Sequence, residues 1–167
     1  MKMLLNNNFF FWIFCCVELE SKNSYSYKIV KLFVSFMKYT TKFIVVRYAE
    51  TDQMQFVHHS NYLKYFEMAR LEWLSSLGVS YAAMEKEGIL MPVVSARLDF
   101  KKPLYFGDEF KVEVIFKKAP MATLEFDYEI VNQDNILICE GGTVLAFLDS
   151  KKNRPIRCPK LMLDLFT

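Results

Sequence analysis

The sequence has little of what marks several common classes of protein. Its four cysteines, Cys15, Cys16, Cys139 and Cys158, lack the paired spacing of a metal site, and the adjacent Cys15 and Cys16 are poorly suited to a disulfide with each other. Glycine and proline number only five each in 167 residues, so most of the chain is expected to be ordered. These features favour a reduced, cytoplasmic location.

The chain also has almost no excess of positive over negative charge. The formal net charge is +2, and it comes from residues 1–36, which hold four Lys and two Glu; from residue 37 onward, 17 basic residues balance 17 acidic ones. A protein that binds nucleic acid needs a concentration of Lys and Arg to neutralise phosphates. The balance therefore argues against a nucleic-acid partner.

Long hydrophobic runs are missing as well. The apolar run at residues 9–17 is too short to span a bilayer as a helix, so no stable membrane insertion is expected. Lys2 ahead of this run gives it the look of a signal peptide, but no small-x-small cleavage site follows. We therefore expect residues 1–36 to be an extension, such as one from an upstream start codon, and residues 37–167 to form the functional domain. A secretion or membrane signal is the alternative.

What the sequence does contain is apolar residues that recur at two different spacings, one typical of strands and the other of helices. Residues 39–48, rich in β-branched and aromatic side chains, predict a strand. Residues 60–77 predict a long helix, with Ser60 as its cap and Gly78 at its end. One face of this helix carries large apolar residues at the spacing of a buried stripe: Tyr62, Phe66, Ala69 and Trp73.

In the second half of the domain, apolar and polar residues alternate along the chain. A short helix at 80–87, ending at Gly88, is followed by four segments typical of half-buried strands: 94–101, 110–117, 124–130 and 136–148. The pair Gly141-Gly142 in the last strand suggests a bulge or bend. One long helix and a meander of strands predict an α+β domain in which a curved antiparallel sheet wraps around the helix. Its edge strands need cover, so a dimer that joins two sheets is expected.

The polar loop at 49–59 is the candidate site. It holds Asp52 and both histidines of the chain, His58 and His59, between the first strand and the long helix. An acid in such a loop is ordinarily a turn or capping residue, and a loop histidine is more often structural than catalytic. Neighbouring histidines rarely bind one ion, and no third ligand is near, so no metal is expected.

Several motifs in and after this loop resemble one known family. They are Tyr48-Ala-Glu-Thr-Asp52, Val57-His-His-Ser-Asn-Tyr62, Phe66-Glu67, Ala69-Arg70, Pro103-Leu-Tyr-Phe-Gly-Asp108 and Arg154-Pro155. In content, order and spacing they resemble the hotdog-fold acyl-CoA thioesterases of the 4-hydroxybenzoyl-CoA type, and within these the branch associated with the Tol-Pal system. The resemblance implies a five-stranded antiparallel sheet around one central helix. It also implies hydrolysis of a small or medium acyl-CoA, with no cofactor beyond the coenzyme A of the substrate.

The resemblance also assigns roles by motif position. Asp52 matches the catalytic acid, as general base or as nucleophile, and His59 and Tyr48 match positions that support it. The start of helix 60–77 is a natural site for the oxyanion. Candidate substrate-binding residues are Gln55, Val57, His58, Asn61 and Tyr62. Gln55 is a departure, because the family has Gly or Ser there, and a longer side chain could narrow the pocket.

Two other functions stay open at this point. A non-catalytic module that binds acyl-CoA or acyl carrier would keep the fold but lose turnover through Gln55. A hotdog dehydratase acting on a hydroxyacyl thioester would use His59 as a base. Assembly as a homodimer or a homotetramer is expected in each case. Candidate clamps for coenzyme A phosphates are Lys101, Lys102, Lys117, Lys118, Lys151, Lys152, Arg154 and Arg157.

Overall fold

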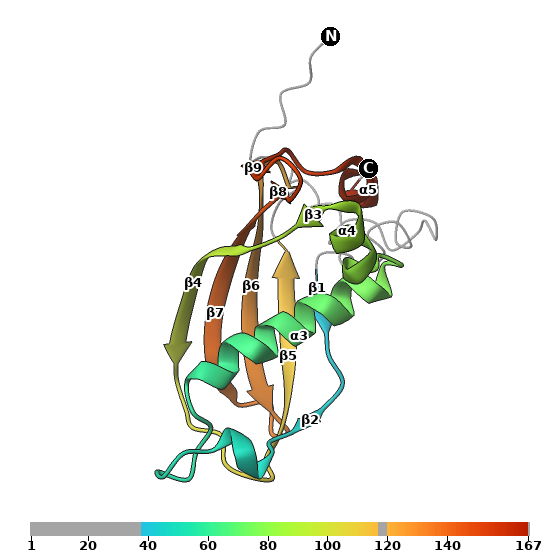
Figure 1. Cartoon of the computed structure of the whole chain (residues 1–167). Coiled ribbons are helices and arrows are strands. Elements are labelled where there is room, and N and C mark those ends of the chain that lie inside the picture. The colour runs from blue at the N-terminus through green and yellow to red at the C-terminus, as the bar shows by residue number, and fades with distance from the viewer. Residues whose placement is uncertain (1–37, 117–119, 167) are drawn as a thin grey trace, which may run out of the picture. The chain divides into compact units, whose positions relative to one another are not determined.

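The computed structural model describes residues 38–116 and 120–166 (Figure 1). The predicted extension at 1–36 lies outside the described residues, and so do two of the candidate phosphate clamps, Lys117 and Lys118. In chain order the elements are β1 (Lys38–Thr40), β2 (Ile44–Val45), η1 (Tyr48–Glu50), α3 (Ser60–Ser76), α4 (Tyr81–Glu87), β3 (Ile89–Leu90), β4 (Val93–Phe100), β5 (Glu109–Phe116), β6 (Thr123–Asn132), β7 (Leu137–Ala146), β8 (Leu148–Asp149), β9 (Arg154–Pro155), α5 (Lys160–Leu163) and η2 (Asp164–Phe166).

The main sheet is antiparallel, with the order β1-β5-β6-β7-β4. β2 also pairs with β5, beyond the stretch that pairs with β1, so the six strands fill five positions. Helix α3 crosses one face of this sheet (Figure 1). The α+β architecture with one long central helix is as predicted.

The strand predicted at 39–48 is instead two short strands and a 3-10 turn. At the break, the hydroxyl of Thr41 accepts a hydrogen bond from the Val112 N–H at 3.0 Å, where a regular ladder would use a backbone carbonyl. The Thr41 N–H still donates to the Val112 carbonyl, also at 3.0 Å. This side-chain substitution keeps the chain beside β5 while ending regular pairing, which period and propensity alone could not indicate.

The core lies between α3 and the sheet, on the face that the alternating pattern predicts. The inward residues of β5 and β6 are all buried: Phe110, Val112, Val114, Phe116, Leu124, Phe126, Tyr128 and Ile130. The predicted helix stripe of Tyr62, Phe66, Ala69 and Trp73 is buried as well. Phe66 stacks on Tyr128 with ring centroids 4.1 Å apart, so the middle of α3 sits directly on the sheet.

The sequence predicted a bulge or a bend at Gly141-Gly142, and the bulge is not found there. Both glycines pair in regular register with β4 and β6, and the register shifts fall at Val93/Ser95 and Ile130/Val131. A Cβ on Gly141 would lie 2.4 Å from the Phe66 ring. Gly141 is therefore required for the close approach of helix and sheet, which is the other use of glycine within a strand.

The ends of α3 are partly as predicted. Gly78 adopts φ +76° and closes the helix in a Schellman motif: its N–H donates to the Ser75 carbonyl and the Val79 N–H donates to the Leu74 carbonyl, both at 3.0 Å. At the start, Ser60 is the first helical residue rather than the cap; His59 holds the cap position without a side-chain hydrogen bond to the helix. The Ser60 hydroxyl instead contacts His58 Nδ1 at 2.8 Å.

Strand β4 departs from the half-buried alternation predicted for 94–101. It forms one edge of the sheet, and its first five residues are all exposed, apolar Val93 and Val94 included. Exposed apolar residues on an unpaired edge are what a covering partner would bury.

Candidate active site

The Asp52 loop is a small hairpin that carries its acid near the tip. Thr51 and Val57 form an antiparallel bridge, and the Asp52 N–H donates to the Phe56 carbonyl at 3.0 Å. The Asp52 carboxylate is half-buried, and its Oδ1 accepts the Met54 N–H at 2.8 Å, an Asx turn. No hydrogen bond within the described residues reaches Oδ2. The turn thus orients the carboxylate and leaves one oxygen available.

A cleft runs along this carboxylate. Its lining combines the loop with the β4–β5 connection and consists of Tyr48, Thr51, Asp52, Gln53, Gln55, Tyr105 and Phe106. The two segments are joined by a Phe56–Tyr105 bridge and by a hydrogen bond from the Val57 N–H to the Leu104 carbonyl at 2.8 Å. The exposed ring of Tyr48 meets Phe106 edge-on, with centroids 5.7 Å apart. The cleft therefore unites Tyr48, Asp52 and Gln55 of the predicted site.

Gln55 occupies a backbone conformation that suits glycine. Its φ is +70°, in the left-handed region that side chains with a Cβ disfavour. Its N–H donates to the Asp52 carbonyl at 2.9 Å, which closes the turn beneath the carboxylate. The resemblance expects Gly or Ser here, and the backbone supplies the physical reason for glycine. Gln55 keeps the turn at the cost of strain and adds a side chain to the cleft.

The two histidines lie beyond the cleft, at the entry to α3. Their rings are 4.0 Å apart; His58 is half-buried and His59 is exposed. The Ser60 N–H donates to His58 Nδ1 at 3.3 Å and the Asn61 N–H to the His58 carbonyl at 2.9 Å. The Tyr62 N–H makes only a long contact of 3.4 Å with the His59 carbonyl. Most amides of the first turn, the predicted oxyanion donors, thus have local acceptors.

The remaining three predicted substrate residues are built into the framework. Val57 is buried at the base of the hairpin, and the buried Asn61 donates through Nδ2 to the Glu50 carbonyl at 2.8 Å. Tyr62 packs edge-on against Phe100 with centroids 5.0 Å apart, and burial raises the pKa of its hydroxyl to about 12. None of the three lines the cleft beside Asp52.

Glu50 is an anchor that sequence reasoning missed. Its carbonyl also accepts the His58 N–H at 2.9 Å, so it ties the hairpin to the helix start. Its carboxylate accepts the Arg47 N–H at 2.8 Å and Arg47 Nη2 at 2.6 Å. Burial raises the pKa of this carboxyl, but these hydrogen bonds outweigh burial and hold it below its usual value. The spacing of Arg47 and Glu50 resembles a capping box and could have signalled it.

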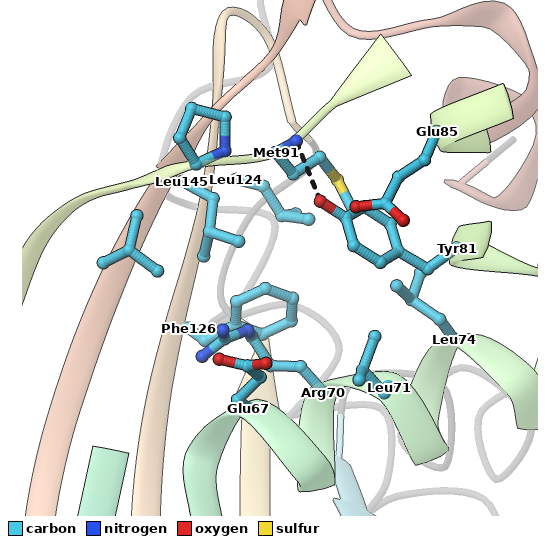
Figure 2. Close-up of a pocket in the computed structure, with 12 residues that line it drawn as sticks. Glu67, Arg70, Leu71, Leu74, Tyr81, Glu85, Met91, Leu124, Phe126 and Leu145 are labelled. Atoms are coloured by element: carbon cyan, nitrogen blue, oxygen red, sulfur yellow. Dashed lines mark hydrogen bonds between the residues drawn. The ribbon is translucent and has the colours of Figure 1, made fainter. Parts of the chain in front are cut away.

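A second cavity opens farther along α3, against α4 and the sheet (Figure 2). It contains Arg70, which the sequence analysis quoted only as part of a motif. Arg70 falls four residues after Phe66 and three before Trp73, so the helical stripe itself indicates a buried position. Its exposed fraction is 7%. A charged residue on a buried face was the signal that went unused.

Other predictions concern metals, thiols, membranes and phosphate clamps. In residues 38–116 and 120–166, no three His, Cys, Asp or Glu residues cluster as metal ligands. Cys139 is a buried free cysteine, and burial raises the pKa of its thiol to about 11. Within the same ranges no helix is both long and apolar enough to cross a membrane. Among the candidate clamps, Lys101 pairs with Glu140 at 3.1 Å and Lys152 with Asp149 at 3.7 Å.

Comparison with known proteins gives a consistent result. Residues 46–166 match the family described as Thioesterase-like superfamily. A Bacillus subtilis protein named "Putative acyl-CoA thioesterase YneP" is 35% identical over 131 residues, 78% of this chain and 95% of that protein. The Escherichia coli O6:H1 "Acyl-CoA thioester hydrolase YbgC" is 26% identical over 72% of this chain and 90% of its own.

Solved structures give the same result for the fold. A DHNA-CoA thioesterase from Staphylococcus aureus is 38% identical, with a TM-score of 0.69 over 72% of this chain and 80% of that one. Together with the family match, this similarity confirms the hotdog fold predicted from the motifs.

Proposed function

Because the chain belongs to the thioesterase-like superfamily, we propose that it hydrolyses the thioester of a small or medium acyl-CoA to a free acid and coenzyme A. Its relatives are named as acyl-CoA thioesterases and thioester hydrolases, so the chain is an enzyme of the thioester hydrolase class. Within the superfamily, the motif resemblance favours the Tol-Pal-associated branch. The cysteine usage favours a cytoplasmic location.

The observation that supports this proposal most is the state of the Asp52 carboxylate. It is half-buried in a cleft, oriented by the Met54 N–H through Oδ1, and its Oδ2 has no hydrogen bond within the described residues. An oriented carboxylate with one free oxygen facing a cleft is suited to general-base or nucleophilic chemistry.

Two routes are compatible with this geometry. In the first, Asp52 takes a proton from water, the water oxygen attacks the thioester carbon, and the tetrahedral intermediate expels the thiolate of coenzyme A. In the second, Asp52 attacks the carbon itself and expels the thiolate to leave a mixed anhydride, which water then cleaves. Both give the acid and coenzyme A, and both pass through a negatively charged oxygen.

That oxygen needs hydrogen-bond donors, for which we propose the first turn of α3. The Tyr62 amide is the best candidate, since its contact with the His59 carbonyl is long, at 3.4 Å, and can be exchanged for a stronger acceptor. Tyr48, at the cleft wall, is assigned to support of the acyl thioester, and His59, exposed at the helix entry, to support of the loop.

Gln55 favours a second candidate function. Its side chain lines the same cleft as Asp52, where a smaller residue would leave more room for the thioester. A non-catalytic module that binds acyl-CoA is therefore the alternative.

The substitution Asp52→Asn distinguishes the two functions. The amide keeps the shape of the side chain and its Asx turn but cannot act as a base or nucleophile. We expect kcat/KM on a panel of acyl-CoAs to fall by roughly 10²- to 10⁴-fold, with an unchanged melting temperature and acyl-CoA affinity. A wild-type protein that binds acyl-CoA tightly without turnover would favour the binding module, and full activity in Asp52→Asn would remove Asp52 from the chemistry.

We also propose that the enzyme is a homodimer, or a homotetramer of such dimers, joined through β4. Among the described strands β4 pairs only with β7, and its Val93, Val94 and Phe100 are exposed at 46%, 59% and 51%. A second copy would continue the sheet and cover these residues. Light scattering should give at least twice the mass of the chain, and Val94→Lys should lower it. A monomeric wild-type protein would overturn the proposal.

A further inference from the structure

The second cavity has the make-up of a ligand pocket. It has a volume of about 300 Å³, at the lower end of the range for small-molecule sites. Its walls are mostly apolar, among them Leu71 and Leu74 of α3, Leu124 and Phe126 of β6, and Leu145 of β7. Figure 2 shows Glu67 and Arg70 projecting from α3, and Tyr81 and Glu85 from α4, toward this space. It shares no lining residue with the Asp52 cleft.

Arg70 is the unusual member of this lining. Its guanidinium, 7% exposed, donates through Nη1 to the Tyr128 hydroxyl at 3.2 Å, and that hydroxyl lies 2.8 Å from Thr143 Oγ1. Both partners are neutral. Among the ion pairs formed within 38–116 and 120–166, none includes Arg70. A guanidinium has five N–H donors, and within the described residues the other nitrogens of Arg70 are not among the buried polar atoms that lack a partner. They therefore reach the cavity, where a ligand oxygen can accept from them.

The other charged residues of the pocket indicate whether the ligand oxygen that accepts from Arg70 is charged or neutral. Glu67 and Glu85, both exposed to solvent, also line it, so the lining carries two carboxylates and one guanidinium. A ligand carboxylate would meet this negative excess. A neutral oxygen avoids it, because a hydroxyl or carbonyl accepts from Arg70 without bringing a charge, and a hydroxyl can also donate to a carboxylate. The favoured ligand is an apolar body bearing a neutral oxygen function.

The position of the pocket connects it to the proposed reaction. Helix α3 begins just after the Asp52 loop, and Arg70 lies roughly 15 Å along the helix axis from Ser60, at about 1.5 Å per residue. This is the scale of a medium acyl chain. Val93, at the start of the exposed β4 edge, also lines the pocket, so an acyl group could enter from the cleft of the same chain or from that of a second copy.

We propose that this pocket receives the far end of the acyl group and that Arg70 selects acyl groups that carry a hydroxyl or keto oxygen there. This inference rests on the proposed thioesterase function for the identity of the ligand. Arg70 is in this view a specificity-determining residue, remote from the carbon that reacts. Saturated acyl chains and chains ending in a carboxylate are the disfavoured classes.

The test compares coenzyme A thioesters that differ only at the chain end, in a hexanoyl and a decanoyl series: methyl, hydroxymethyl, methyl ketone and carboxylate ends. Dissociation constants are measured by calorimetry on Asp52→Asn, which prevents turnover, and on Asp52→Asn/Arg70→Met. We expect a hydroxyl or ketone to bind about 10- to 100-fold more tightly than the methyl end in at least one series, since it gains a hydrogen bond to a charged group. Arg70→Met should abolish that preference and leave the methyl-ended thioester unaffected.

The controls separate this idea from the thioesterase assignment. Arg97→Met removes an arginine that is exposed on β4 and should retain the preference. Arg70→Lys, which keeps a cation but loses the planar fork, should retain part of it and serves if Arg70→Met does not fold. Equal affinity for methyl and oxygenated ends, or a preference that survives both Arg70 changes, overturns the inference. Failure of the wild-type enzyme to hydrolyse any thioester overturns the proposed function instead, since the binding comparison does not require turnover.

Discussion

The centre of α3 and the Asp52 loop are held in opposite ways. Phe66 stacks on Tyr128, whose ring is 4.1 Å away and 8° from parallel, and the edge of its ring lies against the bare backbone of Gly141, the cross-strand partner of Tyr128. Elements distant in sequence therefore fix its position together. The Asp52 turn is fixed by its own residues, through hydrogen bonds to Met54 and Gln55, and one of its residues is strained. Stability is therefore concentrated under the helix, and the proposed catalytic residue lies on a loop that can change without unfolding the domain.

The largest predicted effect concerns the core between α3 and the sheet, and Gly141→Ala tests it. The new Cβ would lie 2.4 Å from the Phe66 ring and 2.8 Å from the Arg97 carbonyl oxygen, so helix, sheet or both must shift. We expect the free energy of unfolding to fall by about 3 kcal/mol, the upper part of the usual range for overpacking. Urea denaturation measures the change.

Gly142→Ala is the matched control, since its Cβ would meet nothing closer than Asp127 Oδ1 at 3.3 Å. Its cost should be clearly smaller. Equal losses in the free energy of unfolding at the two positions would show that α3 can move away from the sheet at little cost. The core would then not be rigid.

The sequence predicted the fold well because apolar periodicity reports burial directly. The stripe from Tyr62 to Trp73 and the alternation through Phe110 to Phe116 are both buried as expected. Errors arose where one side chain changes the hydrogen bonding or allows a close contact. Thr41 splits the first strand, and Gly141 serves the contact with Phe66 rather than a bulge. Such effects depend on a partner residue that lies far away in the sequence, which one local window does not contain.

The candidate site was predictable only in part. The motif proposed Asp52, which lines a cleft, but Tyr105 and Phe106 reach that cleft from a connection far along the chain, and only tertiary pairing brings them there. The substrate roles of Val57, Asn61 and Tyr62 were predicted from motif position, and these residues are buried and do not line the cleft beside Asp52. A motif preserves the spacing of residues along the chain, and it does not say which of them face the cleft.

A smaller effect is predicted in the Asp52 loop, where substitutions of Gln55 test the backbone strain of the turn. Gln55→Gly relieves the left-handed conformation at φ +70° and should stabilise the protein by about 0.5–1 kcal/mol, after allowance for the greater freedom of glycine in the unfolded chain. Gln55→Ala is the control, because it shortens the side chain but keeps the Cβ that causes the strain. If the side chain narrows the cleft, both variants should raise kcat/KM for bulky acyl-CoAs, while only Gly gains stability in thermal unfolding. A gain in stability for Ala equal to that for Gly would mean that this turn carries no backbone strain, and the contrast with the core would then lie in exposure alone.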